Sequence, residues 1–277
     1  MLKLPLLLCS SLILSHLCWG LNAKTTVANI DVVAVEDISW GYLNPARAAK
    51  GPSAADLWGD RTQNTPSGIL LKFPAGFSSP PHIHNISYRG VVIKGQLHND
   101  DPSAATMWLP AGAYWTQPAG EAHITAANQQ INMAYIEINS GPYLVQPTTL
   151  AFDNGERPIN VDPSNLVWLD ATESSRLSGT PAKMAYLWEE NTASEAHGRL
   201  LKLPANFSGN IKTQAASFKA VVIAGSVQLT APTATKALLP GSYFGTDSAQ
   251  TFAINGHPTE QTLLYINAEQ PYQVAIN

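Results

Sequence analysis

An internal repeat at one fixed offset constrains this chain more than any other feature of its sequence. Residues 71–78 (LKFPAGFS) recur as 201–208 (LKLPANFS), and Leu57-Trp58 recurs as Leu187-Trp188. The same offset relates three further pairs of segments: 91–93 with 221–223, 109–110 with 239–240, and 135–136 with 265–266. One register kept from Leu57 to Ile136 indicates a duplicated domain.

The repeat divides the chain into two domains of similar size. Because 45% of the 277 residues are hydrophobic, each half has enough apolar side chains to fill a core. We predict an N-terminal domain over residues 30–148, a linker over 149–163 and a C-terminal domain over 164–277. The linker region is rich in Asn, Asp and Pro, which is typical of a connection between domains.

Each copy consists of short apolar runs that end at turn residues. Residues 68–73 stop at Pro74 and Gly76, and residues 90–93 stop at Gly95. No long segment shows the 3.6-residue period of an amphipathic helix, and turn signals recur about every ten residues. This pattern predicts an all-β protein made of two tandem jelly-roll barrels.

Residues 1–23 have the features of a secretory signal peptide. Lys3 precedes an apolar run over residues 4–19, which is short for a membrane span, and Ala23 follows as a small residue. Cleavage would export the protein to the periplasm or the outside of the cell and leave no membrane span. It would also remove Cys9 and Cys18, the only cysteines, which excludes disulfides and cysteine catalysis.

Charge and motifs exclude several functions. A net charge of −4 argues against nucleic-acid binding, which needs clustered Lys and Arg. The sequence also lacks a phosphate-binding Gly-x-x-x-x-Gly-Lys loop, a Gly-x-Ser-x-Gly nucleophile motif, Cys-x-x-Cys and His-Glu-x-x-His.

Three histidines form the strongest candidate site. His82 and His84 are separated by a single residue, so a strand places both imidazoles on one face. His123 follows further along the chain, after turns at Gly112 and at residues 118–120, where a barrel brings its strand back beside the first. Three imidazoles with open positions suit a divalent metal, with Zn, Fe, Mn, Ni and Cu not distinguished. The alternative is that these histidines are ordinary surface or core residues.

The spacing around these histidines resembles the two motifs of the cupins. Gly76, five residues, His82 and His84, then Tyr88 and Gly95 resemble the first motif. Gly112, Pro118-Ala119-Gly120 and His123 resemble the second. The resemblance covers both copies and implies a bicupin, most similar to secreted ChrR-like cupins of undefined function. It is specific for the fold but not for the activity, because cupins host unrelated chemistries.

Tyr88 stands where the first cupin motif has a glutamate that binds the metal. The resemblance therefore leaves three roles open for Tyr88. It is a phenolate ligand, a general base close to the metal, or an aromatic wall of the pocket. We include Tyr88 as a candidate catalytic residue.

The second copy lacks the candidate ligands. At equivalent positions it has Lys212 for His82, Gln214 for His84, Phe218 for Tyr88 and Phe252 for His123. We expect the Lys212 ammonium to repel a divalent cation, so that the C-terminal barrel binds no metal.

Two other side chains near these motifs carry expectations. We expect His98 to face solvent, in a turn-like segment. Arg89 follows Tyr88 directly, so strand alternation should direct it out of the barrel and into an ion pair.

These features favour a metal-dependent enzyme that acts on a small organic molecule, by dioxygenase, lyase or isomerase chemistry. A second hypothesis is a non-catalytic protein that binds or senses a metal and a small ligand. A third is a pair of structural barrels that bind metal adventitiously. The sequence carries no signal for an oligomeric state.

Overall fold

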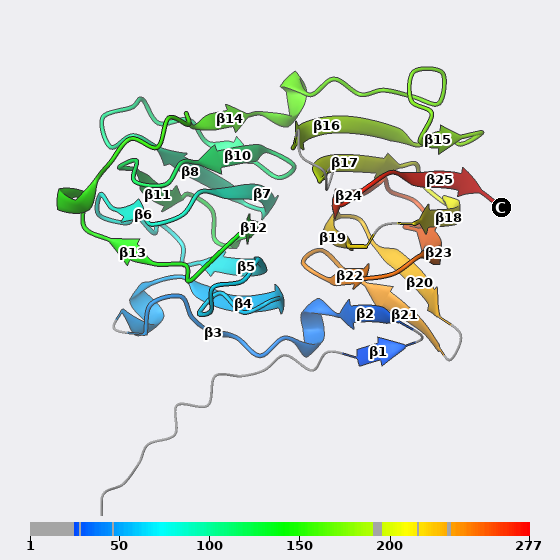
Figure 1. The fold of residues 1–277 in the computed structure, drawn as a ribbon, viewed down its shortest axis with the longest axis horizontal. Helices are drawn as coiled ribbons and strands as arrows, with labels where there is room; N and C mark the ends of the chain where they lie inside the picture. The colour runs from blue at the N-terminus through cyan, green and yellow to red at the C-terminus, as the bar shows by residue number, and fades with distance from the viewer. Residues whose placement is uncertain (1–24, 28, 46, 191–195, 215, 232–233) are drawn as a thin grey trace, which may run out of the picture.

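A computed structural model describes residues 25–27, 29–45, 47–190, 196–214, 216–231 and 234–277. The signal peptide predicted over residues 1–23 lies outside these ranges. The described residues form β-strands and four short 3-10 turns, with no α-helix among them. The all-β fold of two jelly-roll barrels is therefore confirmed, and Figure 1 shows the barrels side by side.

The first barrel has a large sheet and a smaller opposing layer. The seven strands of the large sheet are, in order, β14 (Ile159–Val161), β10 (Tyr114–Gln117), β7 (Tyr88–Lys94), β12 (Asn132–Ile138), β5 (Ser67–Phe73), β4 (Ser53–Trp58) and β3 (Gly41–Tyr42). The opposing layer contains β11 (Ile124–Ala127), β8 (Gln96–Asp100) and β9 (Leu109–Pro110), together with the pair β13 (Val145–Gln146) and β6 (Ile83–His84).

The second barrel consists of two large sheets. One contains β1 (Thr25–Val27), β2 (Ile30–Val33), β22 (Tyr243–Thr246), β19 (Phe218–Ala224), β24 (Thr262–Ala268), β17 (His197–Leu203) and β16 (Lys183–Glu189). The other contains β15 (Leu177–Ser178), β25 (Tyr272–Ile276), β18 (Ser208–Thr213), β23 (Gln250–Gly256), β20 (Val227–Ala231) and β21 (Ala234–Leu238). The 3-10 turns are η1 (Val35–Asp37), η2 (Ala48–Lys50), η3 (Thr148–Leu150) and η4 (Pro163–Asn165).

Strand pairing reproduces the repeat seen in the sequence. Tyr135 on β12 lies opposite Leu70 on β5, and Tyr265 on β24 lies opposite Leu200 on β17. The two pairs are related by the offset of the sequence repeat. Gly68 and Gly198 are also equivalent, because a Cβ on either would overlap the ring of Trp58 or Trp188. The two copies therefore share register as well as sequence.

The barrels exchange strands at their edges. The early strand β2 pairs with β22 of the second barrel, with Val32 opposite Phe244. The later strand β14 pairs with β10 of the first barrel, with Val161 opposite Tyr114. The precise boundaries 30–148, 149–163 and 164–277 stay predictions.

Three apolar clusters hold the molecule together. One fills each barrel, and a third lies between the two large sheets and includes Leu70, Tyr135, Leu200 and Tyr265. Because β5 faces a core on both sides, its residues 67–71 are all buried, and residues 69–71 form a continuous apolar run. Full burial of one such leucine stabilises the fold by about 1.5–3 kcal/mol.

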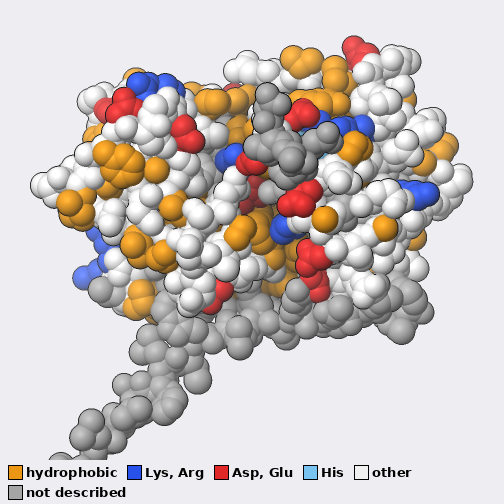
Figure 2. All heavy atoms as spheres, viewed as in Figure 1, with side chains coloured by type: hydrophobic (Ala, Val, Ile, Leu, Met, Phe, Trp, Pro, Cys, Tyr) orange, Lys and Arg blue, Asp and Glu red, His pale blue; other side chains and the backbone are white. Residues whose placement is uncertain are grey.

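A buried polar network joins the barrels within this third cluster. The carboxylate of Glu137 accepts hydrogen bonds from Tyr135 Oη at 3.0 Å, Tyr265 Oη at 2.5 Å and Asn267 Nδ2 at 3.0 Å. Glu137 and Asn267 occupy equivalent positions of the two repeats. Figure 2 shows charged side chains of both signs gathered along the junction on one face of the molecule.

Candidate metal centre

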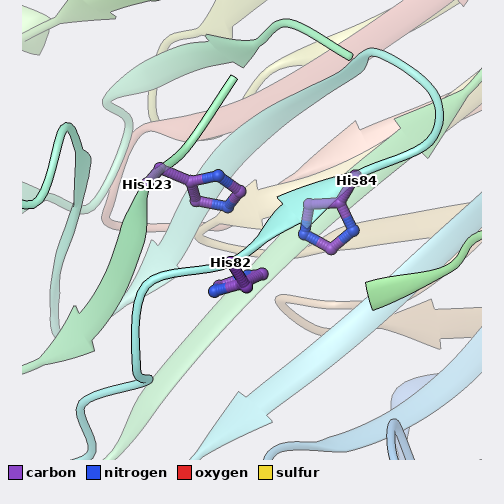
Figure 3. Close-up of side chains that lie close together, drawn as sticks. All are labelled: His82, His84 and His123. Carbon is purple, nitrogen blue, oxygen red and sulfur yellow. The ribbon is translucent and has the colours of Figure 1, made fainter. Parts of the chain in front are cut away.

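The structure brings His82, His84 and His123 together in the first barrel (Figure 3). His82 and His123 face each other across an antiparallel bridge, with backbone N···O distances of 3.0 Å in both directions. His84 follows on β6 and projects toward the other two. One ring nitrogen from each histidine lies within 4.8 Å of the others, and the ring centroids are 4.3–5.2 Å apart.

Backbone carbonyls orient all three rings. Nδ1 of His82 lies 2.9 Å from Pro80 O, Nδ1 of His84 lies 2.9 Å from Leu144 O, and Nδ1 of His123 lies 3.2 Å from Glu121 O. A carbonyl oxygen only accepts hydrogen bonds, so each Nδ1 carries the proton and each Nε2 keeps a lone pair. This tautomer is the one that metal-binding histidines use with outer-shell carbonyls.

Burial keeps these imidazoles neutral. Burial, together with the charges of His123 and His82, lowers the pKa of His84 well below its usual range. Burial and the charge of His82 lower the pKa of His123 to about 3. Burial also lowers the pKa of His82. Nε2 of His123 has no hydrogen-bond partner in the described part of the chain, so the donor set fits a divalent ion of the borderline type that imidazole prefers.

Tyr143 is a site residue that the sequence did not reveal. Its ring stacks on His84 with 4.4 Å between centroids, and its hydroxyl donates to His84 Nε2 at 3.1 Å. Tyr143 lies beyond both histidine motifs, in the segment after β12. A signal existed in the repeat, because Pro142-Tyr143 and Pro271-Tyr272 follow the corresponding strands of the two copies.

Tyr88 makes its hydrogen bond away from the histidines. Its hydroxyl donates to Asn99 Oδ1 at 3.0 Å, and Asn99 is in turn held by Thr125 Oγ1 and Gln117 Oε1. The ring of Tyr88 packs edge-on against His84 at 5.2 Å. Burial raises the pKa of the Tyr88 phenol. These contacts are those of a pocket wall, and a ligand or base role for Tyr88 stays a prediction.

His82 and His84 line a cavity of about 340 Å³. Its walls are mainly apolar and aromatic, with Leu71, Phe73, Phe77, Trp115 and Ile136 among them. Among the described residues that line it, Arg47 is the only Lys, Arg, Asp or Glu side chain. A volume of this size admits a small organic molecule.

Of the two neighbouring expectations, one is wrong and one is confirmed. His98 is not solvent-facing. It is 2% exposed, because its strand β8 is paired on both sides and Trp108 covers the ring at 6.2 Å. Arg89 does point out of the barrel, where it pairs with Glu190 at 3.5 Å and lies 3.9 Å over the ring of Trp188.

In the second barrel, aromatic side chains take the place of the histidine cluster, with Phe218 equivalent to Tyr88 and Phe252 equivalent to His123. Phe218, Phe244, Phe252 and Tyr272 pack with ring centroids 5.1–6.3 Å apart. Lys212 does not oppose a cation there, contrary to our expectation. It is exposed, and Ile211 lies opposite Phe252 as the inward-facing pair, because the strand register places Lys212 on the outer face.

A family model described as a domain of unknown function, DUF4437, matches residues 31–275. The chain belongs to the DUF4437 family. No curated protein matches this DUF4437 chain. Within the described residues, no helix is both long and apolar enough to cross a membrane.

Solved structures share the fold of this DUF4437 protein. A "putative dioxygenase" from Nostoc punctiforme superposes with a TM-score of 0.67 at 15% identity, over 88% of this chain and 83% of that chain. Hazelnut (Corylus avellana) vicilin gives 0.56 at 8% identity, over 88% and 87%. The oxalate decarboxylase of Lactobacillus farciminis gives 0.54 at 12% identity, over 90% and 89%. The resemblance to the cupins is confirmed at the level of the fold.

Proposed function

We propose that this protein is a bicupin enzyme that holds a divalent metal on Nε2 of His82, His84 and His123 and acts on a small organic molecule. One observation carries the proposal. Three neutral imidazoles, each fixed through Nδ1 by a backbone carbonyl, lie together, and two of them, His82 and His84, line a cavity large enough for a substrate. Placing three histidines in this way serves no packing purpose that apolar side chains would not serve better.

A bound divalent ion supplies Lewis acidity toward a carbonyl or carboxylate, or activates dioxygen or water. The residues of this chain supply the rest. The aromatic walls hold an apolar substrate body, and Arg47 at the cavity binds a carboxylate on it. The ring of Tyr143 stacks on His84 and orients it, and the hydrogen bonds behind Tyr88 fix that ring as a wall of the cavity.

Among the three reaction types, dioxygenase chemistry has the most support. It rests on the fold shared with the Nostoc protein and on the mainly apolar cavity. Lyase and isomerase chemistry are the alternatives, since both can use the same three histidine ligands. The fold shared with the oxalate decarboxylase supports lyase chemistry.

Metal content decides the first part of the proposal. Protein purified from its own host without a histidine tag should contain about one equivalent of divalent metal by mass spectrometry. His84→Ala should lose the metal and stay folded, whereas Gln214→Ala, at the equivalent position of the second barrel, should retain it. Less than about a tenth of an equivalent in the wild-type protein would reject both the enzyme and the metal-binding alternative.

A non-catalytic binding or sensing protein, of the kind that ChrR-like cupins suggest, is the second candidate. Tyr143 supports it, because a side chain stacked on His84 limits access to that ligand. Turnover separates the two. The metal-loaded protein is supplied with small aromatic carboxylates. An enzyme consumes many equivalents of oxygen or substrate, whereas a sensor binds about one equivalent of ligand and consumes none.

Residues 1–23 extend the proposal to location. An apolar run after Lys3 and before Ala23 supports cleavage and export to the periplasm or the outside of the cell. The N-terminal sequence of the protein isolated from its host tests this point, and an intact Met1 would contradict it.

A further inference from the structure

The second barrel contains a buried arginine whose hydrogen-bonding groups are not satisfied. Arg199 on β17 is 1% exposed, and its Nε and Nη1 have no hydrogen-bond partner in the described part of the chain. Its Nη2 lies 3.4 Å from a carboxylate oxygen of Glu189, which is itself 59% exposed. The guanidinium also lies 4.0 Å from the centre of the Tyr186 ring. One distant, solvated carboxylate leaves most of this charge uncompensated.

A second arginine adds to the same region. Arg176 lies just before β15, 6.0 Å from the centre of the Tyr272 ring, and its Nη1 is buried without a partner among the described residues. Burial, followed by the positive charge of Arg176, lowers the pKa of Arg199, so the two guanidinium groups repel each other. Ser174, two positions before Arg176, is buried and contributes a hydroxyl that is likewise unpaired in the described chain.

Each of these three side chains has at least one buried hydrogen-bond donor without an acceptor among the described residues. Leaving a buried donor unsatisfied costs about 1–3 kcal/mol, and more for a charged group. A buried unpaired charge is among the largest penalties that a fold sustains. Two like charges in one region therefore imply a negatively charged partner that arrives from solution.

We propose that Arg199, Arg176 and Ser174 bind a small oxyanion inside the second barrel. The planar guanidinium fork matches the oxygens of phosphate, sulfate or a carboxylate. The anion is small and free rather than part of a polymer, because Arg199 is enclosed by the barrel. This site lies outside the histidine cluster and needs no metal. The oxyanion proposal can therefore be tested independently of the proposed enzyme activity.

Inorganic phosphate and sulfate are the probes. Full-length protein is dialysed into chloride buffer. Phosphate or sulfate is then titrated into it in a calorimeter, and its thermal unfolding is compared in phosphate, sulfate and chloride at the same ionic strength. Any anion retained through dialysis is released by acid denaturation and measured by ion chromatography. We expect either about one equivalent of released oxyanion or saturable binding that raises the unfolding temperature beyond the effect of chloride. The absence of both would overturn the proposal.

Variants assign the site. Arg176→Met should weaken oxyanion binding at least tenfold, and Ser174→Ala should weaken it severalfold. In chloride alone, Arg176→Met should unfold at the same temperature as the wild type or higher, because it removes an uncompensated charge. Arg157→Met, which alters an exposed arginine paired with Asp153, serves as the control and should bind like the wild type. Equal affinity in Arg176→Met and the wild type would show that the anion binds elsewhere and would contradict the assignment.

Discussion

The hydroxyl of Tyr143 donates a hydrogen bond to Nε2 of His84, the same nitrogen that a metal ion would use. The other ring nitrogen of His84 is committed to Leu144 O. A metal ion and the phenol therefore compete for one lone pair, and binding of the metal must break or redirect this hydrogen bond.

Tyr143→Phe should consequently bind divalent metal more tightly than the wild type. The lost hydrogen bond has a net value of about 0.5–1.5 kcal/mol, which corresponds to an affinity gain of roughly two- to tenfold. Competition with a chromophoric chelator measures this change. Tyr42→Phe is the control, because Tyr42 is an exposed tyrosine of β3 and its change should leave metal affinity unchanged. Weaker binding by Tyr143→Phe would instead identify Tyr143 as a ligand.

The apoprotein should lose stability in acid through its buried histidines. The folded-state pKa of His123 is about 3, below the usual value of 6.5. Between these values the unfolded chain binds a proton that the folded chain does not. Each such histidine therefore lowers the free energy of unfolding by up to about 1.4 kcal/mol per pH unit as the pH falls from about 6.5 towards 3, and contributes nothing at higher pH.

Urea unfolding at several pH values tests this linkage. The double variant His84→Gln/His123→Gln should show a shallower pH dependence than the wild type over this window, because glutamine does not titrate. Gln214→Ala, which alters the non-titrating residue equivalent to His84 in the second barrel, provides the reference and should keep the wild-type slope.

Arg47→Gln should weaken the binding of a carboxylate substrate. If Arg47 pairs with the substrate carboxylate, its loss should cost roughly 1.5–3 kcal/mol, a ten- to hundredfold rise in KM or Kd. Benzoate and benzamide can be compared as probes, since only the first is charged, and the amide should bind both proteins alike. Lys50→Gln is the control, because Lys50 ends the turn η2 that directly follows Arg47 and does not line the cavity.

Glu137→Gln should destabilise the junction between the barrels. The glutamine amide nitrogen is a donor, so it faces another donor at one or more of the three hydrogen bonds that the carboxylate now accepts. We expect a loss of about 2–4 kcal/mol in the free energy of unfolding. Glu190→Gln, at the partly exposed ion pair with Arg89, should change stability by less than about 1 kcal/mol. Comparable small losses in both variants would show that the network contributes little.

The repeat and the histidine spacing were sufficient to predict both barrels and the meeting of His82, His84 and His123. The histidine spacing is a local signal and the repeat is a periodic one. The alternation of side chains along a strand and the equivalence of the two repeats then predict where these residues lie. Other features depend on register and distant contacts. The register of β18 against β23 places Ile211 opposite Phe252 on the inner face and leaves Lys212 on the outer face. The burial of His98 depends on the strands that pair with β8 on both sides.

Tyr143 and the arginines of the second barrel were missed for a related reason. None of them belongs to a motif that the sequence analysis identified, and their neighbours are set by the fold. Tyr143 reaches His84 across 59 positions of the chain. Arg176 lies 6.0 Å from the centre of the Tyr272 ring, although the two residues are 96 positions apart in the chain.

The exchange of β2 and β14 has a consequence for how this gene can be divided. Residues 30–33 complete a sheet built mostly from the end of the chain, and residues 159–161 complete one built from its beginning. A stop codon placed after the first repeat would leave β10 with a bare edge and release β2 without its neighbour. Two halves produced as separate polypeptides should consequently recover their shape only in each other's presence, as complementing fragments.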